Sequence, residues 1–414
     1  MAHLRIAVAQ LGARMHYALP RCMEEAGCLG IFYTDTYAGP IAQKFSRAIG
    51  TEHLPEAMRR FLGRVPHGVP GNKIHAFTKF GMEYRLRAKW GRTPSQRTAT
   101  HIWAGQRFCR LVNQTGLPES SAVYALNSAA LELFAVANQT KRFAILEQTS
   151  APRRIERELV QREHRAWPGW ESSSDDDHSE EFAAREEEEW RRADLVVCGS
   201  EFVKSSYKGL GGDPEKCKVV PYGVDRYADK VERPKSCKLR VLFVGTVNLH
   251  KGVQYLLAAA SKLPPTEFEF RIVGPIRLSQ TAVSGAPKHV QFVGSVPRTE
   301  VAQHYRWADV FVFPSVCEGS ATVCYEALAY GLPVITTPNA GSVVRDGLEG
   351  YVVPVSEYQP IEAKLNELQR SPEKREQFSA EARNRASEFT VASFRRRLIS
   401  TLGIETPELC TTVN

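Results

Sequence analysis

Short apolar runs rich in Val, Ile and Phe alternate with amphipathic stretches through the second half of the chain. This alternation is typical of βαβ units, in which buried parallel strands are joined by helices. We predict six strands, at residues 239–244, 268–273, 290–293, 309–313, 333–337 and 350–354. Helical patterns occupy residues 252–263, 300–307 and 321–330 between them. The second half is therefore predicted to form one doubly wound parallel sheet.

The first half repeats this alternation less regularly. It opens with a predicted strand at residues 5–9 and a helix at residues 15–26, and further strands fit residues 122–126, 144–148 and 195–199. Prolines and charges interrupt the pattern near residues 222–238. We therefore predict an α/β protein with three parts. These are an N-terminal domain at 1–225, a C-terminal domain at 236–385, and a last segment, 386–414, whose helix at 391–402 could cross back to the first domain.

The composition is that of a globular protein large enough for more than one core. Of 414 residues, 43% are hydrophobic and 24% are charged. The nine cysteines include no Cys-x-x-Cys pair, which argues against a disulfide framework and a zinc site. No apolar run approaches the roughly 18 residues that a membrane span needs. The first residues are typical of a strand and not of a signal peptide. We expect a cytoplasmic protein.

The net charge of +8 is unevenly distributed. Residues 1–150 hold 19 Lys and Arg against 9 Asp and Glu, whereas residues 151–190 hold 6 against 13. The acidic segment could be a divalent-metal site, but it lacks the ordered ligand spacing of a calcium loop. The favoured interpretation is a solvated loop that runs into a helix whose first turn accommodates acids.

Basic and aromatic residues are interleaved within residues 77–97. Such a stretch could lie on an anionic membrane surface, on the inner face of the membrane, or it could be a solvent-facing helix. No nucleic-acid recognition motif accompanies the charge, so nucleic acid is not expected as a partner. The basic positions are Lys79, Arg85, Arg87, Lys89, Arg92 and Arg97.

Two loops in the second half combine residues that can hold an anion. Ligands of open parallel sheets bind outside the carboxyl ends of the strands. The strand at 239–244 is followed by Gly245, Thr246 and Lys251. A glycine loop lets backbone amides approach a phosphate, and a lysine at the start of the following helix adds a point charge. Taken alone this pattern is unspecific, because it matches neither a Walker A loop nor a dinucleotide fingerprint.

The second loop follows the strand at 309–313. Ser320 suits a helix N-cap there and Gly319 permits close backbone approach, so the amides of Ala321, Thr322 and Val323 are predicted to form an anion site. Glu318 precedes the helix and Glu326 lies within it, and a carboxylate is a good acceptor for paired sugar hydroxyls. Phosphate-binding amides flanked by two acids predict a nucleotide-sugar site.

The segment from Glu318 to Glu326, continuing through Gly331 and Pro333, resembles the Glu-x7-Glu segment of family-4 glycosyltransferases of the GT-B fold. Other landmarks match that family in order, at residues 193–200, 219–225, 243–252, 273–275, 292–296 and 308–315. The resemblance is specific over about residues 190–355. It implies two Rossmann-like domains that face each other across a cleft, with the acceptor on the N-terminal side and the nucleotide-sugar on the C-terminal side.

The resemblance also implies roles for individual residues. Glu318 would contact the hydroxyls of the donor sugar, Glu326 the donor ribose, and Lys251 the diphosphate. Gly12 would approach donor and acceptor from the first domain, and backbone near Val296 would contact the base. The full set implied for the donor is Gly12, Gly245, Thr246, Lys251, Val296, Glu318, Gly319, Ser320, Ala321, Thr322, Val323 and Glu326.

The chain departs from the family pattern at two positions. Thr246 stands where many members have an arginine, so the second cation for the diphosphate is missing or is supplied elsewhere. Gln148 aligns with a histidine of the family. Glutamine can hydrogen-bond a sugar hydroxyl but cannot exchange a proton at neutral pH. The catalytic candidates are therefore Glu318, Lys251 and Gln148, with Glu147 as the alternative to Gln148.

By this resemblance the chain is a retaining glycosyltransferase that needs neither a metal nor a resident cofactor, because the nucleotide-sugar is a co-substrate. The acceptor would be a hydroxyl of a saccharide or a lipid-linked saccharide, in polysaccharide or glycolipid synthesis. Two alternatives stay open. One is a nucleotide-sugar epimerase or phosphorylase of the same fold, and the other is a binding module without turnover.

Overall fold

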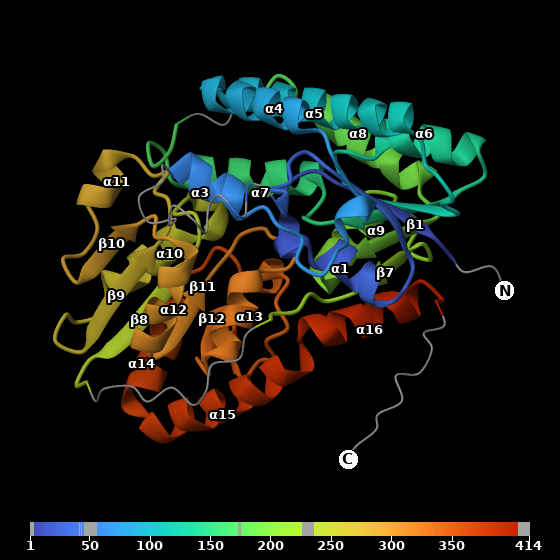
Figure 1. The fold of residues 1–414 in the computed structure, drawn as a ribbon. Coiled ribbons are helices and arrows are strands. Elements are labelled where there is room, and N and C mark those ends of the chain that lie inside the picture. Colours follow the sequence, from blue (N-terminus) through green and yellow to red (C-terminus); the bar gives the residue numbers. More distant parts are fainter. Residues whose placement is uncertain are drawn as a thin grey trace, which may run out of the picture.

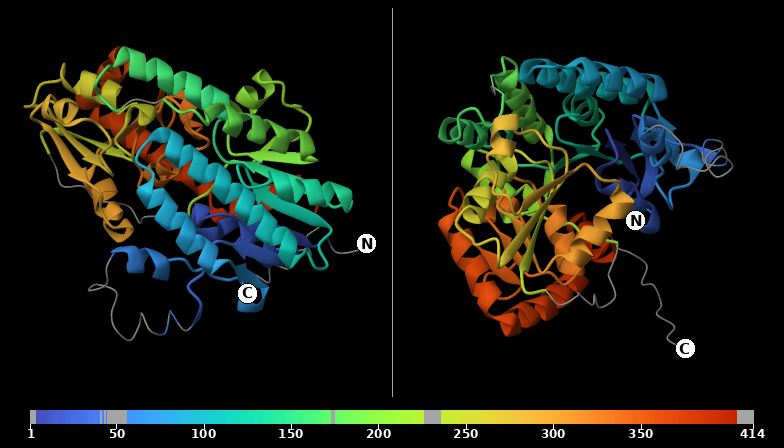
Figure 2. Two further views of the ribbon diagram at one scale, coloured as in Figure 1. Left: turned by 90° about the horizontal axis from the view of Figure 1, so that it is seen from above. Right: turned by 90° about the vertical axis from the view of Figure 1, so that its left-hand side faces the viewer.

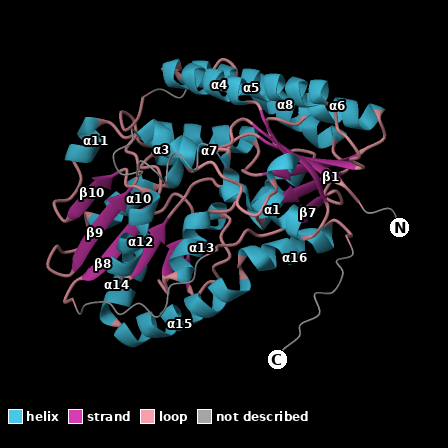
Figure 3. Cartoon of the chain, viewed as in Figure 1, coloured by secondary structure: helices cyan, strands magenta, loops and turns pink. Residues whose placement is uncertain are grey.

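Two parallel sheets, each flanked by helices, form the two halves of the computed structural model (Figures 1 and 3). The structure describes residues 4–40, 42, 44, 56–172, 175–225 and 236–404. Part of the predicted boundary, residues 226–235, and the end of the last predicted segment lie outside the described residues. The predicted α/β fold of two Rossmann-like domains is confirmed.

The first sheet has the strand order β3-β2-β1-β4-β5-β6-β7. Its strands are β1 (Ile6–Gln10), β2 (Leu29–Thr34), β3 (Ile74–Ala76), β4 (Ala122–Leu126), β5 (Phe143–Gln148), β6 (Leu195–Cys198) and β7 (Cys217–Val219). Its helices are α1 (Ala18–Glu25), α3 (Glu56–Leu62), α4 (Thr78–Trp90), α5 (Pro94–Thr115), α6 (Leu131–Gln139), α7 (Arg153–Ala166), α8 (Ser179–Arg192) and α9 (Glu201–Gly209). Strand order reverses between β1 and β4.

The second sheet has the strand order β10-β9-β8-β11-β12-β13. Its strands are β8 (Leu239–Val244), β9 (Phe268–Val273), β10 (Val290–Gly294), β11 (Val310–Phe313), β12 (Val334–Thr336) and β13 (Gly350–Val352). Its helices are α10 (Val253–Ala260), α11 (Gln280–Ser284), α12 (Arg298–Trp307), α13 (Thr322–Ala329), α14 (Gln359–Arg370) and α15 (Pro372–Glu388). Here the order reverses between β8 and β11.

The predictions match the second sheet strand for strand, but they include only four of the seven strands of the first. Strand β8 shows why the second sheet is easy to predict, since all six of its residues are buried and five are apolar. The one charged member, Arg240, donates to both carboxylate oxygens of Asp309, at 2.9 and 2.7 Å. The missed strands β3 and β7 have three residues each, and β2 contains Gly30, which weakens a strand pattern.

The last helix, α16 (Val391–Thr401), belongs to the core of the first domain. Figures 1 and 2 show the red C-terminal helices running from the second domain to the first. Phe394, Leu398 and Ile399 of α16 are buried in one cluster with Leu19 and Met23 of α1. The chain therefore crosses between the domains a second time at its described end.

The turn before α1 departs from the predicted helix. Helix α1 begins at Ala18, and Met15, His16 and Tyr17 before it have φ of +45°, +50° and +62°. Left-handed conformations cost roughly 1–2 kcal/mol for each residue that is not glycine. The side chain of Gln10 holds the turn by donating to the carbonyls of Gly12 (3.0 Å) and Arg14 (3.1 Å). Strain of this kind persists where surrounding contacts enforce it.

A buried carboxylate on α7 joins the two domains. Glu163 is 3% exposed and accepts hydrogen bonds from Gln254 (2.8 Å), Tyr255 (2.6 Å) and Ser356 (2.7 Å), all in the second domain. Several donors are required to bury a carboxylate without a large cost. Further along the chain, Glu171 accepts from the amide of Leu249 at 2.5 Å. These contacts place α7 beside the loop that follows β8.

Candidate active site

A cavity of about 950 Å³ lies at the carboxyl edge of the first sheet. Its walls are the loops after β1, β2 and β4, the inward faces of α4, α5, α7 and α8, the acidic residues Glu171 and Asp175 to Asp177 before α8, and Asn248 and His250 from the loop after β8. The loops after β1 and β4 flank the point where strand order reverses, which is where ligands bind in open parallel sheets. Gly12 lines this cavity, as its predicted role requires, with φ of +86° and its amide bound to Asp35 at 3.0 Å.

Lys251 and Glu318 form an ion pair at the edge of the second sheet. Each side chain is about one fifth exposed, so the pair is open to solvent on one side. The short helix at residues 249–251 is capped by Asn248, whose side chain accepts from the amide of Lys251 at 3.1 Å. Gly252 is required next to it, because a Cβ there would lie 1.8 Å from the Pro314 carbonyl oxygen. The predicted sites after β8 and β11 are therefore one site.

The loop that carries Glu318 is packed directly against the first domain. A Cβ on Gly319 would lie 2.0 Å from the carbonyl oxygen of Thr149, and the hydroxyl of Ser200 donates to the carbonyl of Gly319. The prediction that Ser320 caps α13 is wrong: the N-cap is Ala321, and the Ser320 hydroxyl bonds that of Tyr325 at 2.8 Å. The Ser320 side chain is therefore engaged by a residue of α13 itself and does not cap the helix.

Some of the amides expected to hold phosphate already have acceptors in the protein. The amide of Ala321 donates to Ala340 at 3.0 Å, and that of Gly245 donates to Val273 at 2.9 Å. Within the described part of the chain, no acceptor contacts the amides of Thr322 and Val323 in the first turn of α13. The anion-binding capacity of this helix end is therefore concentrated on Thr322 and Val323. Thr246 is half-buried in the loop after β8.

Glu326 lies in the second turn of α13 and is held by an aromatic hydroxyl. Tyr305 of α12, itself buried, donates to it at 2.9 Å, and the Arg298 guanidinium is 3.8 Å away. Val296, the expected base contact, is half-buried in the segment after β10. The structure thus brings Glu318, Lys251 and the start of α13 together, with Glu326 further along the same helix. Lys251, Glu318 and Glu326 do not themselves line the 950 Å³ cavity.

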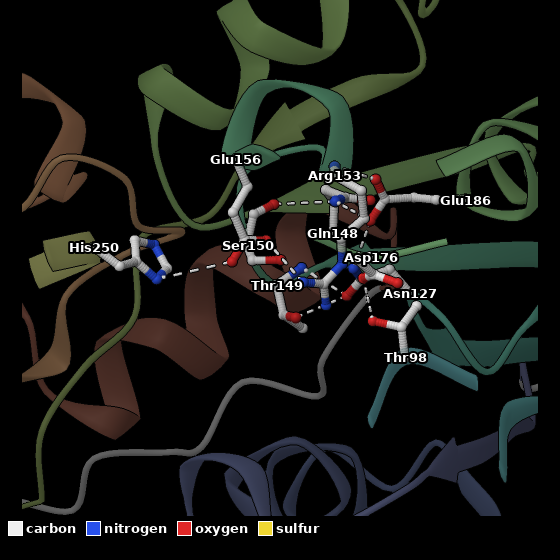
Figure 4. Close-up of polar contacts among 10 residues, drawn as sticks. All are labelled: Thr98, Asn127, Gln148, Thr149, Ser150, Arg153, Glu156, Asp176, Glu186 and His250. Atoms are coloured by element: carbon white, nitrogen blue, oxygen red, sulfur yellow. Dashed lines mark hydrogen bonds and ion pairs between the residues drawn. The ribbon is translucent and has the colours of Figure 1, made fainter. Parts of the chain in front are cut away.

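Gln148 does not lie at the cavity surface. It is fully buried, its amide group donates to the Ser150 carbonyl (3.0 Å) and to Glu186 (2.9 Å), and its oxygen accepts from Trp190 (2.9 Å) (Figure 4). Both hydrogens of the amide are therefore in use, which leaves no donor for a sugar hydroxyl. The structure instead gives Gln148 a positioning role, in place of the predicted contact with substrate.

Glu147, the alternative candidate, is also buried. It is 5% exposed and accepts from the hydroxyl of Tyr222 at 2.9 Å. Burial raises the pKa of Glu147, while the bond from Tyr222 acts in the opposite direction. A carboxyl group with a raised pKa at the carboxyl end of β5 is suited to hold a proton.

Two buried glutamates of α8 organise the loops that form the cavity. Glu186 accepts from the Asn127 side chain (2.9 Å), from Gln148 and from the amide of Arg153 (2.8 Å), the first residue of α7 (Figure 4). Glu189 accepts from the amides of Ser128, Ala130 and Leu131 at 2.8, 2.9 and 3.2 Å.

These two carboxylates accept hydrogen bonds from amides at the starts of α6 and α7, which the N-cap side chains of these helices cannot do. The N-cap residues of α6 and α7 are an alanine and a proline, which have no acceptor side chain. The interpretation of the acidic segment as a solvated stretch is therefore wrong at its end, because Glu186 and Glu189 are 1% and 0% exposed. In the described ranges, no group of three or more His, Cys, Asp or Glu is placed to hold a metal ion.

The cavity contains charged groups that the sequence did not single out. Glu156 pairs with Arg153 (2.7 Å) and lies 3.8 Å from His250 (Figure 4). Burial opposes ionisation of Glu156, but Arg153, His250 and Lys251 outweigh it and hold its pKa below the ordinary value. Burial and the neighbouring Lys251 lower the pKa of His250. Asp35 was missed because it follows β2, a strand that was not predicted.

The basic residues within 77–97 lie on two different surfaces, the cavity wall and the exposed outside of the domain. Arg85 turns inward, lines the cavity and donates to the hydroxyl of Thr36 at 2.7 Å. Arg87 pairs with Glu83 and lies 4.0 Å from the ring of Trp103. The other four basic side chains, Lys79, Lys89, Arg92 and Arg97, are exposed. No helix in the described ranges is both long and apolar enough to span a bilayer.

Known proteins resemble the second domain most clearly in sequence. The family model of glycosyl transferases group 1 matches residues 226–385. A putative colanic acid biosynthesis glycosyltransferase of Salmonella typhimurium is 29% identical over 231 residues, covering 51% of this chain and 57% of that protein. A D-inositol 3-phosphate glycosyltransferase of Catenulispora acidiphila is 33% identical over 189 residues, covering 39% and 44%. The chain thus spans about half the length of the curated relatives it matches.

Solved structures resemble the whole chain in fold. HepE of Anabaena, in complex with UDP and glucose, aligns with a TM-score of 0.59 and 16% identity over 97% of this chain and all of that one. Identity this low supports the fold alone. Residues 226–385 therefore match the model of glycosyl transferases group 1, and they lie in a chain with a two-domain α/β fold of the GT-B type.

Proposed function

We propose that this protein is a retaining, metal-independent glycosyltransferase of family 4. It would move a sugar from a nucleotide diphosphate-sugar to a hydroxyl acceptor in polysaccharide or glycolipid synthesis. One observation carries the proposal. Lys251, Glu318 and the free amides of Thr322 and Val323 converge where strand order reverses in the second sheet, next to the cavity of the first domain. The name of the Salmonella relative supports the polysaccharide context.

The donor diphosphate would bind between Lys251 and the start of α13. Lysine and helix amides supply fixed positive charge where negative charge grows as the glycosidic bond breaks, the task that a metal ion performs in other transferases. Binding of the donor would draw Lys251 toward phosphate and release Glu318 toward the sugar hydroxyls. Their ion pair thus keeps both side chains in position while the site is empty.

The acceptor would occupy the 950 Å³ cavity, with Gly12 at the contact between the two substrates. Gln148 and Glu147 are buried, so we assign neither a contact with the sugar. The leaving phosphate itself would take the proton of the acceptor hydroxyl. Glu326, oriented by Tyr305, would bind the ribose of the donor, and backbone near Val296 the base.

The test is a donor screen followed by product analysis. UDP-, GDP- and ADP-sugars are compared by the rise in melting temperature that a ligand of the native state produces, and the UDP in the Anabaena complex makes UDP-sugars the first donors to try. With the donor that binds, proton NMR of the first product from an α-linked donor should show an α-linkage. A β-linkage would refute retention, and loss of activity in EDTA would refute metal independence.

The same assay separates the alternatives. A transferase releases nucleoside diphosphate only when a hydroxyl acceptor is present. An epimerase would change the donor sugar without acceptor, a phosphorylase would require phosphate, and a binding module would bind the donor without turnover. Any of these three results would overturn the proposal.

We further propose that α4 holds the enzyme on the cytoplasmic face of a membrane. Met82, Leu86 and Trp90 are 53, 52 and 71% exposed and recur every four residues, so they share one face of the helix. Exposed lysines and arginines surround this face. Exposed apolar side chains combined with basic charge are typical of an interfacial helix that lies on anionic lipid.

Co-sedimentation with vesicles tests this placement. Wild type should bind anionic vesicles more than neutral ones, and salt should weaken binding because the Debye length is about 10 Å at 0.1 M. Trp90→Ala should reduce binding. Phe143→Ala removes another aromatic side chain, 47% exposed, from the start of β5 and should leave binding unchanged. Equal loss in both variants would contradict a specific role for α4.

A further inference from the structure

Three arginines line one side of the cavity, over the carboxyl ends of β1 and β2. Arg14 follows β1, Arg64 follows α3, and Arg85 comes from the inner face of α4. The only carboxylate within ion-pair distance of any of them in the described chain is Asp35, which is 2.7 Å from Arg64. Asp35 also accepts from the Gly12 amide, so its charge is shared with backbone. This side of the cavity therefore carries excess positive charge.

The local contacts show that Arg14 and Arg85 are not neutralised. The donor bond of Arg85 goes to a neutral hydroxyl, that of Thr36. Burial and the neighbouring charge of Arg64 lower the pKa of Arg85, as expected where like charges are brought together. Arg14 forms no ion pair with a described residue, and its charge acts to lower the pKa of the buried Glu147. Burial and Asp35 raise the pKa of Tyr84, and the charges of Arg14 and Arg64 both oppose this shift.

The backbone is strained in a way that keeps Arg14 in place. Three consecutive left-handed residues follow it, and the Gln10 side chain binds the carbonyls of Gly12 and Arg14. A surface arginine with no other task would not require such a turn. The wall formed by α7 differs, because Arg153 and Arg157 there have Glu156 and Glu180 as partners.

We propose that Arg14, Arg64 and Arg85 bind an anionic group of the acceptor, a phosphate or a carboxylate, and so determine which acceptors are used. Guanidinium groups present paired donors that match the oxygens of both groups. The inference rests on the proposed function only where it identifies the bound anion as part of the acceptor. Anion binding by the cluster is independent of it.

Binding of simple anions tests the cluster without turnover. Inorganic phosphate and glucuronate are titrated into the full chain by calorimetry at constant ionic strength. Because the diphosphate site could also take phosphate, all titrations are done in the Lys251→Ala background. There, Arg14→Gln and Arg85→Gln should each weaken binding of the preferred anion by roughly tenfold, since each removes one charge-assisted contact. The stronger probe distinguishes phosphate from carboxylate.

Arg157→Gln is the matched control. It removes the same charge from the same cavity, but this arginine is paired with Glu180 at 3.4 Å and lies outside the cluster. We expect anion affinity within about twofold of the parent. Arg85→Gln should melt no lower than the parent, because it relieves like-charge contact, and Arg85→Lys should restore part of the binding. Equal anion affinity in parent, Arg14→Gln and Arg85→Gln would overturn the proposal.

Transfer assays then connect the cluster with the acceptor. Wild type and Arg85→Gln are compared with neutral, uronate-containing and phosphorylated saccharides, and with vesicles that carry a lipid phosphate, which separates soluble from membrane sources. The variant should raise KM for the anionic acceptor about tenfold and leave KM for the donor unchanged. An unchanged KM for the anionic acceptor in Arg85→Gln would refute the inference while the transferase assignment stands. Absence of donor binding would refute the transferase assignment, and the anion titrations would still decide the cluster.

Discussion

The proposed donor side and the proposed acceptor side of this protein are built in different ways. The donor groups come from two short continuous segments of the second domain, one after β8 and one after β11, on both sides of the point where strand order reverses. The cavity of the first domain is assembled from segments between Leu11 and His250, which include the ends of four strands and residues of four helices. A continuous segment can be recognised from its own residues. A dispersed cavity exists only once the chain has folded.

The two sides also differ in how their charges are balanced. On the donor side Lys251 and Glu318 neutralise each other. On the proposed acceptor side Arg64 pairs with Asp35, Arg14 and Arg85 form no ion pair with a described residue, and the carboxylates of α8 are used to cap helices. Two side chains that pair with each other in the protein can exchange that contact for contacts with a substrate. Unpaired positive charge instead favours a ligand of opposite sign.

The largest effect is expected at Glu318. Glu318→Gln keeps the shape of the side chain and removes its charge, so kcat should fall by roughly a hundredfold, the range for a group worth about 3 kcal/mol in the transition state. Steady-state kinetics measures this fall in kcat. Glu300→Gln removes an exposed acid from the first turn of α12 and should have little effect. If kcat per folded molecule were preserved in Glu318→Gln, the donor site would have to lie elsewhere.

Lys251→Ala should have a somewhat smaller effect. It removes one charge-assisted contact with the diphosphate, worth about 1.5–3 kcal/mol, so kcat and donor affinity should fall roughly tenfold to a hundredfold. Lys262→Ala, which truncates an exposed lysine of the same domain, is the control. The double variant with Glu318→Gln should lose less than the sum of the single effects, because the two residues contact each other. Additive losses would show that their pairing has no role in catalysis.

Gly319→Ala tests the contact between the two sides. Its Cβ would lie 2.0 Å from a backbone oxygen of Thr149, an overlap that no side-chain rotation relieves. Overpacking typically costs about 1–3 kcal/mol, so the free energy of unfolding should fall by that amount and activity should fall with it. Gly209→Ala meets no atom within 4 Å and serves as the control. Unchanged stability in Gly319→Ala would mean that the domains separate easily here.

The smallest effect is a pH dependence that belongs to the first domain alone. Burial raises the pKa of Glu189 to about 8, although amides of Ser128 and Ala130 oppose the shift. The folded protein therefore keeps this proton up to about pH 8, while the unfolded chain releases it near pH 4.5. The contribution of the neutral form is fully present below pH 4.5 and is lost as pH rises toward 8.

Urea unfolding between pH 5 and 8 measures this contribution. The free energy of unfolding should decrease with pH more steeply in wild type than in Glu189→Gln, which has no proton to lose. Other titrating groups contribute equally to both chains, so the difference in slope isolates Glu189. Parallel pH profiles would show that Glu189 is already ionised in the folded protein, held by its three amide donors.

Much of the second domain could be predicted because its information is local. Strands such as β8 are buried on both faces and are therefore continuous apolar runs. In the first domain, β3 and β7 are too short to produce a pattern, and the left-handed residues 15–17 resemble the start of a helix in sequence. The burial of Glu186 and Glu189 could not be predicted from the residues next to them, because their hydrogen-bond donors come from loops about 30–60 residues away.

The sequence by itself determined the fold class, the two-domain division and the identity of the groups around Lys251 and Glu318. These follow from hydrophobic periodicity and from residues adjacent along the chain. Only the tertiary structure decided that Lys251 and Glu318 form a pair, that Ser320 and Gln148 face the protein and not the substrate, and that Arg85 belongs to the cavity and not to the outer face of α4. The physical reason is that the partners of a polar side chain are set by which backbone donors and charges reach it after folding, and those lie far away in the sequence.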